Sequence, residues 1–485
     1  MYLVTSDQMQ ALDNHTIHAL FVPGIVLMDY AGKAVADTLR ALAPRHVVVC
    51  TGKGNNGGDG WVAARWCRYY GMKVEVLALA GPSELSGDAA QAAKAAVQFG
   101  VPWCKYVAGQ ELPNGDVYVD ALLGTGASRP LQVGVLSDIV ISLNQSQRPV
   151  IAVDIPTGVN PNTGEVLGEA VQAMYTICFA AQKLGTAISP GCHFAGEVKV
   201  ADIGIPIDDL TAGVVDLGSM ARLTTASEVA KWLPKRVNES HKGSYGRLAI
   251  AVGEMQGAAI LAGMGAARTG AGLITLMATA PLQMSSPLEF VVQVHPDGWT
   301  LPATAKALVV GPGLGQNVSR FANVLANFSG PRVIDADGLQ LIENTSVCPD
   351  AAVITPHPKE CAAMLGWSTE EVQAHRLDAA RSLAAKTGAI VVLKGYHTLI
   401  VNPDGRVHVN PTGDASLATA GTGDVLAGMI GGLLAQSVDA FEAACAGVWL
   451  HGKAGEMAGE SRTQASVVAS EVVDCISRAI RSIST

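Results

Sequence analysis

The sequence is short of aromatic and charged side chains. Phe, Trp and Tyr make up 5% of the 485 residues and charged residues 15%, whereas hydrophobic residues make up 49%. A chain with so much apolar surface to bury and so little charge is globular rather than disordered. Its 53 glycines and many alanines favour α/β layers joined by tight turns. Because 485 residues exceed one ordinary hydrophobic core, we expect two domains.

The sequence also lacks an excess of positive charge, C-x-x-C pairs of cysteines and long apolar runs. The formal net charge of −9 excludes general binding to nucleic acids or anionic membranes, because too few cations are available to neutralise phosphates. The nine cysteines form no C-x-x-C pair, which is typical of reduced thiols in a cytosolic protein. No basic segment followed by an apolar one opens the chain, and no uncharged apolar run reaches about 18 residues. We therefore expect a cytoplasmic protein without a signal peptide or membrane span.

Short apolar runs alternate with helical segments in two series. The first series lies between about 46 and 203, a polar stretch follows it, and the second series starts at "LAIAVG". Such alternation predicts right-handed βαβ units on a parallel sheet. We predict two α/β domains in series, with the first ending near 217, over residues 1–217 and 222–485.

A glycine-rich turn follows the first apolar run of the first domain. Gly52, Gly54 and Gly57 spell G-x-G-x-x-G ahead of a helix, a pattern typical of the contact between a dinucleotide pyrophosphate and a helix N-terminus. A nicotinamide dehydrogenase would also carry an acid at the end of its second strand, and "KVEVLALAGPS" has none at that end. A dehydrogenase is therefore the least favoured interpretation.

Two further strands of this domain end in acids. "VDALLGTGASRP" contains Asp120 and "VDIPTGVN" contains Asp154, each followed by a glycine-containing loop. Loops at the carboxyl ends of parallel strands form the ligand crevice of open sheets. We expect a common pocket for Asn55, Asn56, Asp59, Asp120 and Asp154.

The motifs "GNNGGDG", "VDALLGTG" and "VDIPTG", in this order and spacing, resemble the epimerase domain of NAD(P)H-hydrate repair enzymes over most of residues 1 to 215. The resemblance implies a Rossmann-like domain that converts the R epimer of the hydrated nicotinamide ring into the S epimer at C6, without hydride transfer. It implies that the hydrate is held by Asn55, Asn56, Gly57, Gly58, Asp59, Gly124, Thr125, Gly126, Ala127, Ser128, Arg129, Pro130 and Asp154.

The same resemblance implies a potassium ion at Asn56, Asp120 and Thr157. Members of the family usually have Ser where this chain has Thr157, and the ligating hydroxyl is kept. Ligands that are all oxygen suit a hard cation. Asp154 is the expected acid–base group, which needs a pKa raised by burial to act near neutrality. Lys183 is a candidate catalytic residue that would act as the electrostatic partner of Asp154.

The second domain carries "GTGD" (Gly421 to Asp424) ahead of an apolar helix. The N–H groups and dipole of such a helix start form an anion hole for a transferring phosphoryl group. Asp424 could then take the proton of an attacking hydroxyl. This turn resembles the catalytic turn of ribokinase-like enzymes. Because no G-x-x-x-x-G-K-[ST] loop is present, nucleotide binding here is not of the P-loop type.

Together with "GTGD", the motifs "SHKGSYGR", "GPGLG" and "TPHPKE" resemble the nucleotide-dependent NAD(P)H-hydrate dehydratase across residues 222 to 485. The resemblance implies phosphorylation of the C6 hydroxyl by ADP, with Asp424 as base and Mg²⁺ beside the nucleotide, followed by loss of phosphate. The implied contacts of the S hydrate are Ala258, Gly313, His357 and Asp424. The implied contacts of ADP are Lys394, Gly395, Tyr396, His397, Thr398, Gly421, Thr422 and Gly423.

The favoured hypothesis is thus a bifunctional repair enzyme with NADHX, NADPHX and ADP as its small-molecule partners. The main alternative is a ribokinase-type kinase of a vitamin precursor with a nucleotide-binding regulatory domain, which would accumulate a phosphorylated product. A dinucleotide sensor without turnover is the third. We expect a homo-oligomer, because small α/β domains of both kinds commonly assemble.

Overall fold

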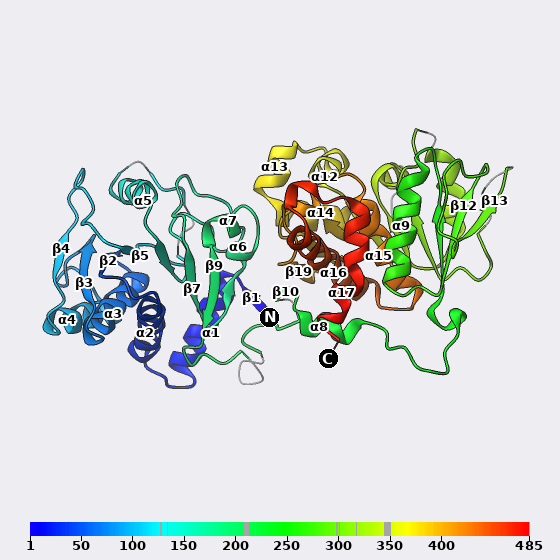
Figure 1. Ribbon diagram of the computed structural model, residues 1–485. Helices are drawn as coiled ribbons and strands as arrows, with labels where there is room; N and C mark the ends of the chain where they lie inside the picture. The colour runs from blue at the N-terminus through cyan, green and yellow to red at the C-terminus, as the bar shows by residue number, and fades with distance from the viewer. Residues whose placement is uncertain are drawn as a thin grey trace. The chain divides into compact units, whose positions relative to one another are not determined.

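The computed structural model describes residues 1–484 except 127, 128, 133, 208–212, 219, 297, 298, 300, 317 and 344–350. The chain divides into two compact units, one of Tyr2–Ala221 and the other of Arg222–Thr485 with Met1 (Figure 1). Within the described residues, no helix combines the length and the apolar character needed to cross a membrane.

The first unit is built on a parallel sheet. Its strands lie side by side in the order β4 (Trp103–Lys105), β3 (Lys73–Ala78), β2 (His46–Thr51), β5 (Val117–Ala121), β6 (Val150–Val153), β7 (Tyr175–Phe179) and β9 (Glu197–Ala201). The chain moves outward from β2 toward β4 and then returns to β5 on the other side of β2. The strand order therefore reverses between β2 and β5, where doubly wound sheets bind their ligands.

Helices cover both faces of this sheet (Figure 1). They are α1 (Ser6–His18), α2 (Gly24–Leu42), α3 (Asn55–Tyr69), α4 (Gly87–Gln98), α5 (Val135–Gln145) and the short α6 (Leu184–Ala187) and α7 (Cys192–Ala195). Successive residues of a strand point to opposite faces. Val47 and Val49 accordingly pack in the core with α2, α3 and α4, while Val48 and Cys50 pack with α5. The apolar run "HVVVC" is buried on both sides for this reason.

A second parallel pair holds the start of the chain in this unit. Strand β1 (Tyr2–Val4) pairs with β8 (Gln182–Lys183), with Val4 opposite Lys183. Helix α1 follows directly, and Thr5 caps it in a reciprocal arrangement with Gln8. This segment brings α1 to the neighbourhood of Lys183.

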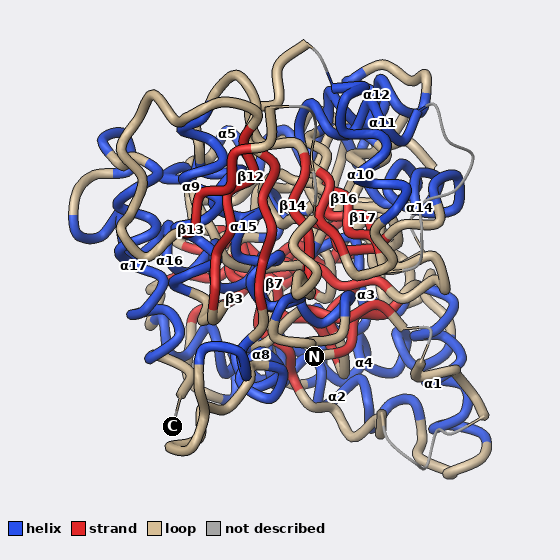
Figure 2. The backbone as a smooth tube through the Cα atoms, turned by 90° about the vertical axis from the view of Figure 1, so that its right-hand side faces the viewer, coloured by secondary structure: helices blue, strands red, loops and turns tan. Residues whose placement is uncertain are grey.

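The second unit also has a mainly parallel sheet. Its strands follow the order β13 (Val291–Val294), β12 (Leu273–Ala278), β11 (Arg247–Ala251), β14 (Ala307–Val310), β15 (Arg332–Ile334), β16 (Ala352–Ile354), β17 (Ile390–Leu393), β18 (Leu399–Val401), β19 (Val407–Val409) and β10 (Ala221–Leu223). Figure 2 shows β13, β12, β14, β16 and β17 in this sequence across the unit. The predicted α/β class with parallel sheets is confirmed.

Strand β18 departs from the parallel arrangement. It runs antiparallel to both β17 and β19. Only residues 394–398 and 402–406 join these strands, and a parallel crossover needs a dozen or more residues. Hairpin pairing is therefore the outcome that these short connections allow.

Buried helices dominate the core of the second unit. The described α-helices are α8 (Ala226–Trp232), α9 (Gln256–Arg268), α10 (Ala322–Asn327), α11 (Gln340–Glu343), α12 (Pro358–Leu365), α13 (Thr369–Ala374), α14 (Arg376–Thr387), α15 (Thr422–Ala435), α16 (Ala440–Ser461) and α17 (Ala469–Arg481). Helix α15 is buried from Val425 to Ala435. A Cβ atom at Gly428 would lie 1.8 Å from the carbonyl oxygen of Ala262 on α9, so glycine is what lets α15 and α9 approach so closely.

Candidate functional sites

The first candidate site lies where the strand order of the first unit reverses. The loops after β2 and β5 touch there, because Gly52 N–H donates to the Ala121 carbonyl at 2.9 Å. A Cβ at Gly52 would lie 1.9 Å from the Leu122 carbonyl oxygen, and one at Gly57 would lie 2.2 Å from that of Gly52. These glycines are required for the close packing of the two loops. That requirement is independent of any phosphate.

Helix α3 begins in this loop with an open N-terminus. Its N-cap is Gly54, and no side chain caps the helix, so N–H groups of the first turn are left for a ligand. Asn55 is exposed, Asn56 is half-buried and Asp59 is half-buried, while Gly57 and Gly58 are buried. The predicted set therefore mixes accessible side chains with glycines that act through their backbone.

The glycine loop after β5 faces α3. A Cβ at Gly124 would lie 3.1 Å from Cβ of Asn56, so Asn56 packs on this loop. The carbonyl of Thr125 accepts a hydrogen bond from Ser6 Oγ at 3.1 Å. Gly126, Arg129 and Pro130 are exposed. The remaining predicted loop residues, Ala127 and Ser128, lie outside the described residues.

Asp120 and Thr157 meet below this loop. Asp120 is fully buried, and its carboxylate accepts from Thr157 Oγ1 at 2.7 Å, from Thr157 N at 2.8 Å and from Leu122 N at 3.3 Å. Burial raises the pKa of Asp120 to about 6, against the lowering effect of these hydrogen bonds. No cation pairs with Asp120 among the described residues.

These residues fit a hard monovalent cation. A buried carboxylate, a hydroxyl and nearby backbone carbonyls are oxygen donors, and a bound cation would balance the buried charge of Asp120. The amide of Asn56 would add its oxygen to these donors, and its Nδ2 atom is buried without a hydrogen-bond partner among the described residues. Within the described part of the chain, no group of three or more His, Cys, Asp or Glu side chains could hold a metal ion, and the set of Asn56, Asp120 and Thr157 contains a single acid.

Asp154 lies at the end of β6 in a left-handed backbone conformation, with φ of +67°. Its Oδ1 atom accepts from Lys183 Nζ and, at 3.1 Å, from Phe179 N. Lys183 is buried and also donates to the carbonyls of Phe179 at 2.9 Å and Ala181 at 3.3 Å. The three donors of the ammonium group are thus occupied. Lys183 holds Asp154 in place, and Oδ2 of Asp154 remains available to a ligand.

Sequence reasoning missed Asp13 in this site. Burial raises the pKa of Asp13 to about 6, and the charges of Lys183 and Asp154 act on it. Burial, followed by the charges of Asp154 and Asp13, raises the pKa of Asp59 well above its ordinary value. The signal was present in the sequence, because Asp13 stands one helical turn from Met9 and Thr16 on the apolar face of α1.

The second candidate site lies at the carboxyl ends of strands in the second unit. The loops after β11 and β14 meet there, because Met255 N–H donates to the Gly313 carbonyl at 3.0 Å. A Cβ at Gly313, whose φ is +63°, would lie 2.9 Å from Cβ of Ala258. The structure thus brings together Ala258 and Gly313, two of the predicted hydrate contacts.

Helix α15 points its N-terminus into the same region. Gly421 precedes it with φ of +89°, and no side chain caps it. The Thr422 hydroxyl instead donates backward to the carbonyls of Leu417 at 2.9 Å and Thr419 at 3.0 Å. The first N–H groups of α15 are therefore free of side-chain caps and suited to an anion.

Asp424 stands in the first turn of α15 beside other charges. Burial raises the pKa of Asp424 to about 6; the negative charge of Asp335 adds to this and Lys394 opposes it. Lys394 Nζ donates to Asp335 Oδ1 at 2.8 Å. A Cβ at Gly423 would lie 3.5 Å from Lys394 Nζ. Asp424 is thus a carboxyl group beside a lysine, and its pKa suits proton transfer near neutrality.

Asp335 and Asp337 are further residues that sequence reasoning missed. Both follow β15, in "RVIDADG". Asp335 is buried, and Asp337 Oδ2 accepts from Gly315 N at 2.9 Å. The rule that singled out Asp120 and Asp154, an acid at the end of a strand, applies equally to Asp335.

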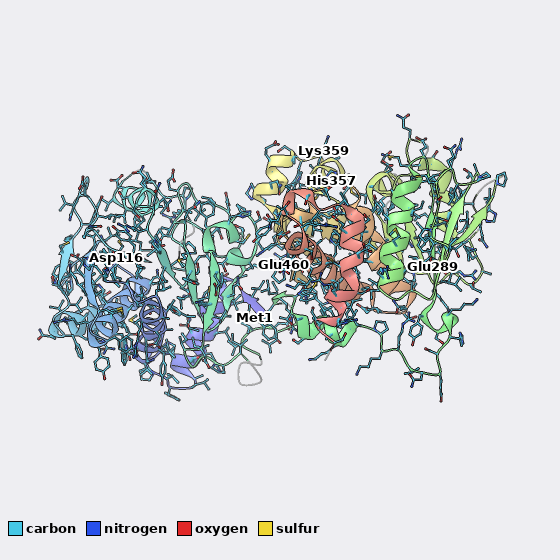
Figure 3. All side chains as sticks on the ribbon, viewed as in Figure 1. Met1, Asp116, Glu289, His357, Lys359 and Glu460 are labelled. Atoms are coloured by element: carbon cyan, nitrogen blue, oxygen red, sulfur yellow. The ribbon has the colours of Figure 1, made fainter. Side chains whose placement is uncertain are left out.

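His357 caps α12. Its Nδ1 atom accepts from Lys359 N at 3.1 Å and Glu360 N at 3.2 Å, while Glu360 accepts from His357 N at 2.7 Å. Figure 3 shows His357 and Lys359 close together near α12. The His357 side chain is half exposed, and its Nε2 lies 3.4 Å from Glu360 Oε1. Its role in capping the helix leaves this Nε2 edge as the part that can meet a ligand.

The predicted nucleotide segment forms the turn from β17 to β18. Buried Arg376 donates to the carbonyls of Leu393 at 3.2 Å and Lys394 at 3.3 Å. Tyr396 is exposed and stacks on His397, with ring centroids 4.5 Å apart. Thr398 Oγ1 donates to the Gly395 carbonyl at 2.8 Å. The turn is therefore braced from inside and presents aromatic rings outward.

A cavity of about 360 Å³ opens beside the Gly313 loop. Its lining includes Glu254, Gln283, Trp299, Arg320 and Phe321. Trp299 and Phe321 pack with ring centroids 4.6 Å apart. The cavity adds an aromatic wall and a cation to the second site, which no sequence motif indicated.

Comparison with known proteins places two families on the chain. The NAD(P)H-hydrate dehydratase family matches residues 248–478, and the family of YjeF-related protein N-termini matches residues 24–185. The bifunctional NAD(P)H-hydrate repair enzyme of Moorella thermoacetica is 35% identical, over 100% of this chain and 97% of the relative. That of Escherichia coli is 35% identical over 89% of this chain and 84% of the relative.

Among solved structures, the chain is similar to the ADP/ATP-dependent NAD(P)H-hydrate dehydratase of Bacillus subtilis, co-crystallised with ATP and Mg²⁺. The identity is 32%, the match covers 54% of this chain and 98% of the other, and the TM-score is 0.49.

Proposed function

Because this chain belongs to the family of bifunctional NAD(P)H-hydrate repair enzymes, we propose how its residues divide the repair between two sites. The first unit is the NAD(P)H-hydrate epimerase and the second is the dehydratase. The observation that carries this assignment is the full-length match to bifunctional relatives, in a chain whose two units each hold their own polar site at the strand ends.

In the first unit, the hydrate lies across the open N-terminus of α3 and the loop from Gly124 to Pro130. Anionic phosphates suit the free N–H groups of a helix start. Asp154 then reaches the reacting C6 hydroxyl through Oδ2, because Lys183 and Phe179 occupy Oδ1. Lys183 acts as a positioning residue that balances the charge of Asp154.

We expect Asp154→Asn to lower the epimerisation rate about 10²-fold or more, since a positioned acid–base group contributes that much. The asparagine oxygen can still accept from Lys183 and Phe179, but Lys183 loses its charge partner, so circular dichroism of the variant checks that the protein is folded. Conversion of purified R hydrate, followed by chromatography, measures the loss. Asp7→Asn, at an exposed position of α1, is the matched control. Full activity of Asp154→Asn would rule out proton transfer by Asp154.

A potassium ion is proposed at Asn56, Asp120 and Thr157. Its support is the buried charge of Asp120 and the oxygen donors around it. When bound, the ion supplies charge balance and holds the two loops at the switch point together. No proton transfer is assigned to these ligands.

We expect Thr157→Val to weaken epimerisation and its dependence on potassium, while Thr157→Ser keeps both. Valine matches the shape of threonine but removes the oxygen that bonds Asp120 and Leu123. Leaving a buried acceptor short of a donor costs about 1–3 kcal/mol. Rates in potassium, sodium and choline chloride at equal ionic strength make the comparison. An identical potassium response in wild type and Thr157→Val would exclude Thr157 as a ligand.

In the second unit, ADP lies along the turn of Lys394 to Thr398 and the glycines of Gly421 to Gly423, with Mg²⁺ on its phosphates. The N-terminus of α15 stabilises the phosphoryl group in transfer. Asp424 takes the proton of the C6 hydroxyl as its oxygen attacks phosphorus, and AMP leaves. Phosphate is a far better leaving group than hydroxide, so its departure from C6 and loss of a proton from C5 restore the ring.

Recovery of reduced-nicotinamide absorbance tests the whole assignment. Purified protein and ADP are added to a mixture of R and S hydrates. Complete recovery requires both sites, since the R form returns only through epimerisation. Recovery that stops at the S fraction would remove the epimerase assignment, and release of a stable phosphorylated product would favour a small-molecule kinase.

A further inference from the structure

Helix α1 is anchored at the proposed epimerase site by its N-terminal end. Strand β1, which leads into it, pairs with β8 so that Val4 stands opposite Lys183. Its first residue, Ser6, donates from Oγ to the Thr125 carbonyl at 3.1 Å and from N to Asn162 Oδ1 at 2.7 Å. The helix is thereby tied to the strand that carries Lys183 and to the loop proposed to hold the hydrate.

Asp13 lies on the inward face of this helix. Met9, Leu12 and Thr16 are the buried residues of α1, and residues three or four apart share a helix face. Asp13 is half-buried. Its carboxyl makes no hydrogen bond or ion pair with any residue that the structure describes. A carboxyl on a buried face without a partner is costly unless it has a function or a proton.

The charges around Asp13 do not cancel. Asp154 and Lys183 form one neutral pair, and the ammonium group of Lys183 has no donor left. Asp13 on α1 and Asp59 on α3 both lie within electrostatic reach of that pair. The site thus holds two more carboxyl groups than its cation can balance, and burial raises the pKa of Asp13 to about 6. Near neutrality, the group exchanges a proton readily.

The epimerisation needs such a group. C6 of the hydrate carries both a hydroxyl and the ring nitrogen, so it is a hemiaminal carbon. Removing the hydroxyl proton and breaking the C6–N bond leaves an aldehyde, and the electron pair goes to nitrogen, which takes a proton. Rotation of the aldehyde and re-addition of nitrogen to its other face invert C6, and both protons return. One base and one acid are required at the same time.

We propose that Asp13 is the second proton-transfer group of the epimerase site. Asp13 in its protonated form gives the proton to the ring nitrogen while Asp154 takes the proton of the hydroxyl, and the two exchange roles on ring closure. This inference rests on the proposed assignment of epimerisation to the first unit. The negative charge of Asp154 raises the pKa of Asp13 and so favours its protonated form.

The test compares Asp13→Asn with Asp7→Asn, an exposed substitution on the same helix. The substrate is purified R hydrate without nucleotide, and rates are corrected for uncatalysed epimerisation. We expect kcat of Asp13→Asn to fall about 10²-fold with KM nearly unchanged, and Asp7→Asn to match wild type. A loss confined to KM, or rates equal to those of Asp7→Asn, would overturn the proposal.

The pH profile gives a second readout. The charges that act on Asp13 are those of Lys183 and Asp154. Asp13 in turn acts on Asp59 of α3, and α1 itself carries Asp7, His15 and His18. Since the acid form is required, kcat/KM of wild type should fall as pH rises through about 6, the pKa of Asp13. This descent should vanish in Asp13→Asn. An unchanged descent would assign it to another group and overturn the proposal.

Folding and function are separated by two controls. Urea unfolding of Asp13→Asn beside wild type checks that the first unit still folds, and Asp13→Glu restores the carboxyl if Asp13→Asn is unstable. Asp13→Glu should recover part of kcat and keep the descent with pH. If Asp13→Glu is stable but lacks both, the inference fails. If wild type itself does not epimerise, the proposed function fails instead.

Discussion

Asp424→Asn is expected to lose nucleotide-dependent dehydration by about 10²- to 10⁴-fold, the contribution of a positioned general base. Asp424 is the acidic residue in the first turn of α15, and its pKa of about 6 lets it take a proton near neutrality. Asparagine has the same shape but cannot accept a proton. The helix start and its anion hole should stay intact, because Thr422 and not Asp424 makes the local hydrogen bonds.

The measurement uses S hydrate with ADP and follows the reduced-nicotinamide absorbance. Epimerisation of the R hydrate by Asp424→Asn should equal that of wild type, since its residues belong to the other unit. Asp474→Asn, exposed on α17, is the control. If both activities disappear together, the assignment of separate sites is wrong. If dehydration survives within threefold, Asp424 is not the base.

The second large effect concerns the stability of the first unit. Lys183→Met should lower its free energy of unfolding by about 3–5 kcal/mol, because removing one partner of a buried ion pair strands the other charge. Lys183 is 1% exposed and Asp154 8%. The substitution also removes the donors to the carbonyls of Phe179 and Ala181.

An exposed ion pair in the same unit serves as the control that separates the effect of burial from the effect of losing a charge. Lys105 and Glu84 form an ion pair with both side chains about half exposed, and Lys105→Met should cost no more than about 1 kcal/mol. Adding Asp154→Asn to Lys183→Met should recover part of the loss, because the stranded charge is gone. Urea unfolding of the full chain is monitored with and without ADP, which shifts only the transition of the unit that binds it. Equal losses for Lys183→Met and Lys105→Met would contradict the buried-pair argument.

The strand-end rule located two acids of the first candidate site. Acids directly after apolar runs located Asp120 and Asp154, and parallel strands bring such ends to one edge. The contact of Asp120 with Thr157 follows from the adjacency of β5 and β6. The spacing of the motifs could not identify the hydrogen-bond partners of Asp154, because Phe179 and Lys183 reach it from the later strands β7 and β8.

Other features required the fold. Asp13 belongs to a helix, and the pairing of β1 with β8, together with the contacts of Ser6, brings that helix to Lys183. The glycines of the loop after β2 match a phosphate-binding pattern, yet Gly52 and Gly57 are also needed for the close packing of the backbone. In "TPHPKE", the His-Pro-x-Glu spacing is that of a capping box, which explains why His357 bonds its own helix.

Family membership, rather than fold, decides between dehydratase and small-molecule kinase. Both chemistries would use a free helix N-terminus and a nearby carboxylate, so the geometry around Asp424 serves either one. Relatives that match 89–100% of the chain are named bifunctional NAD(P)H-hydrate repair enzymes. The kinase alternative leaves the polar site of the first unit without a reaction.

The close packing of α15 on α9 ties catalysis to the hydrophobic core. Gly428 lies one turn after Asp424, and a side chain there would collide with the backbone at Ala262. The helix rises by about 1.5 Å per residue, so Gly428 lies close to the anion hole along the axis. A displacement of α15 at Gly428 therefore displaces the anion hole by nearly the same amount. The packing of α15 in the core thus fixes the position of the phosphoryl group in the proposed site. Substitutions along the buried face of this helix should therefore reduce turnover as well as stability.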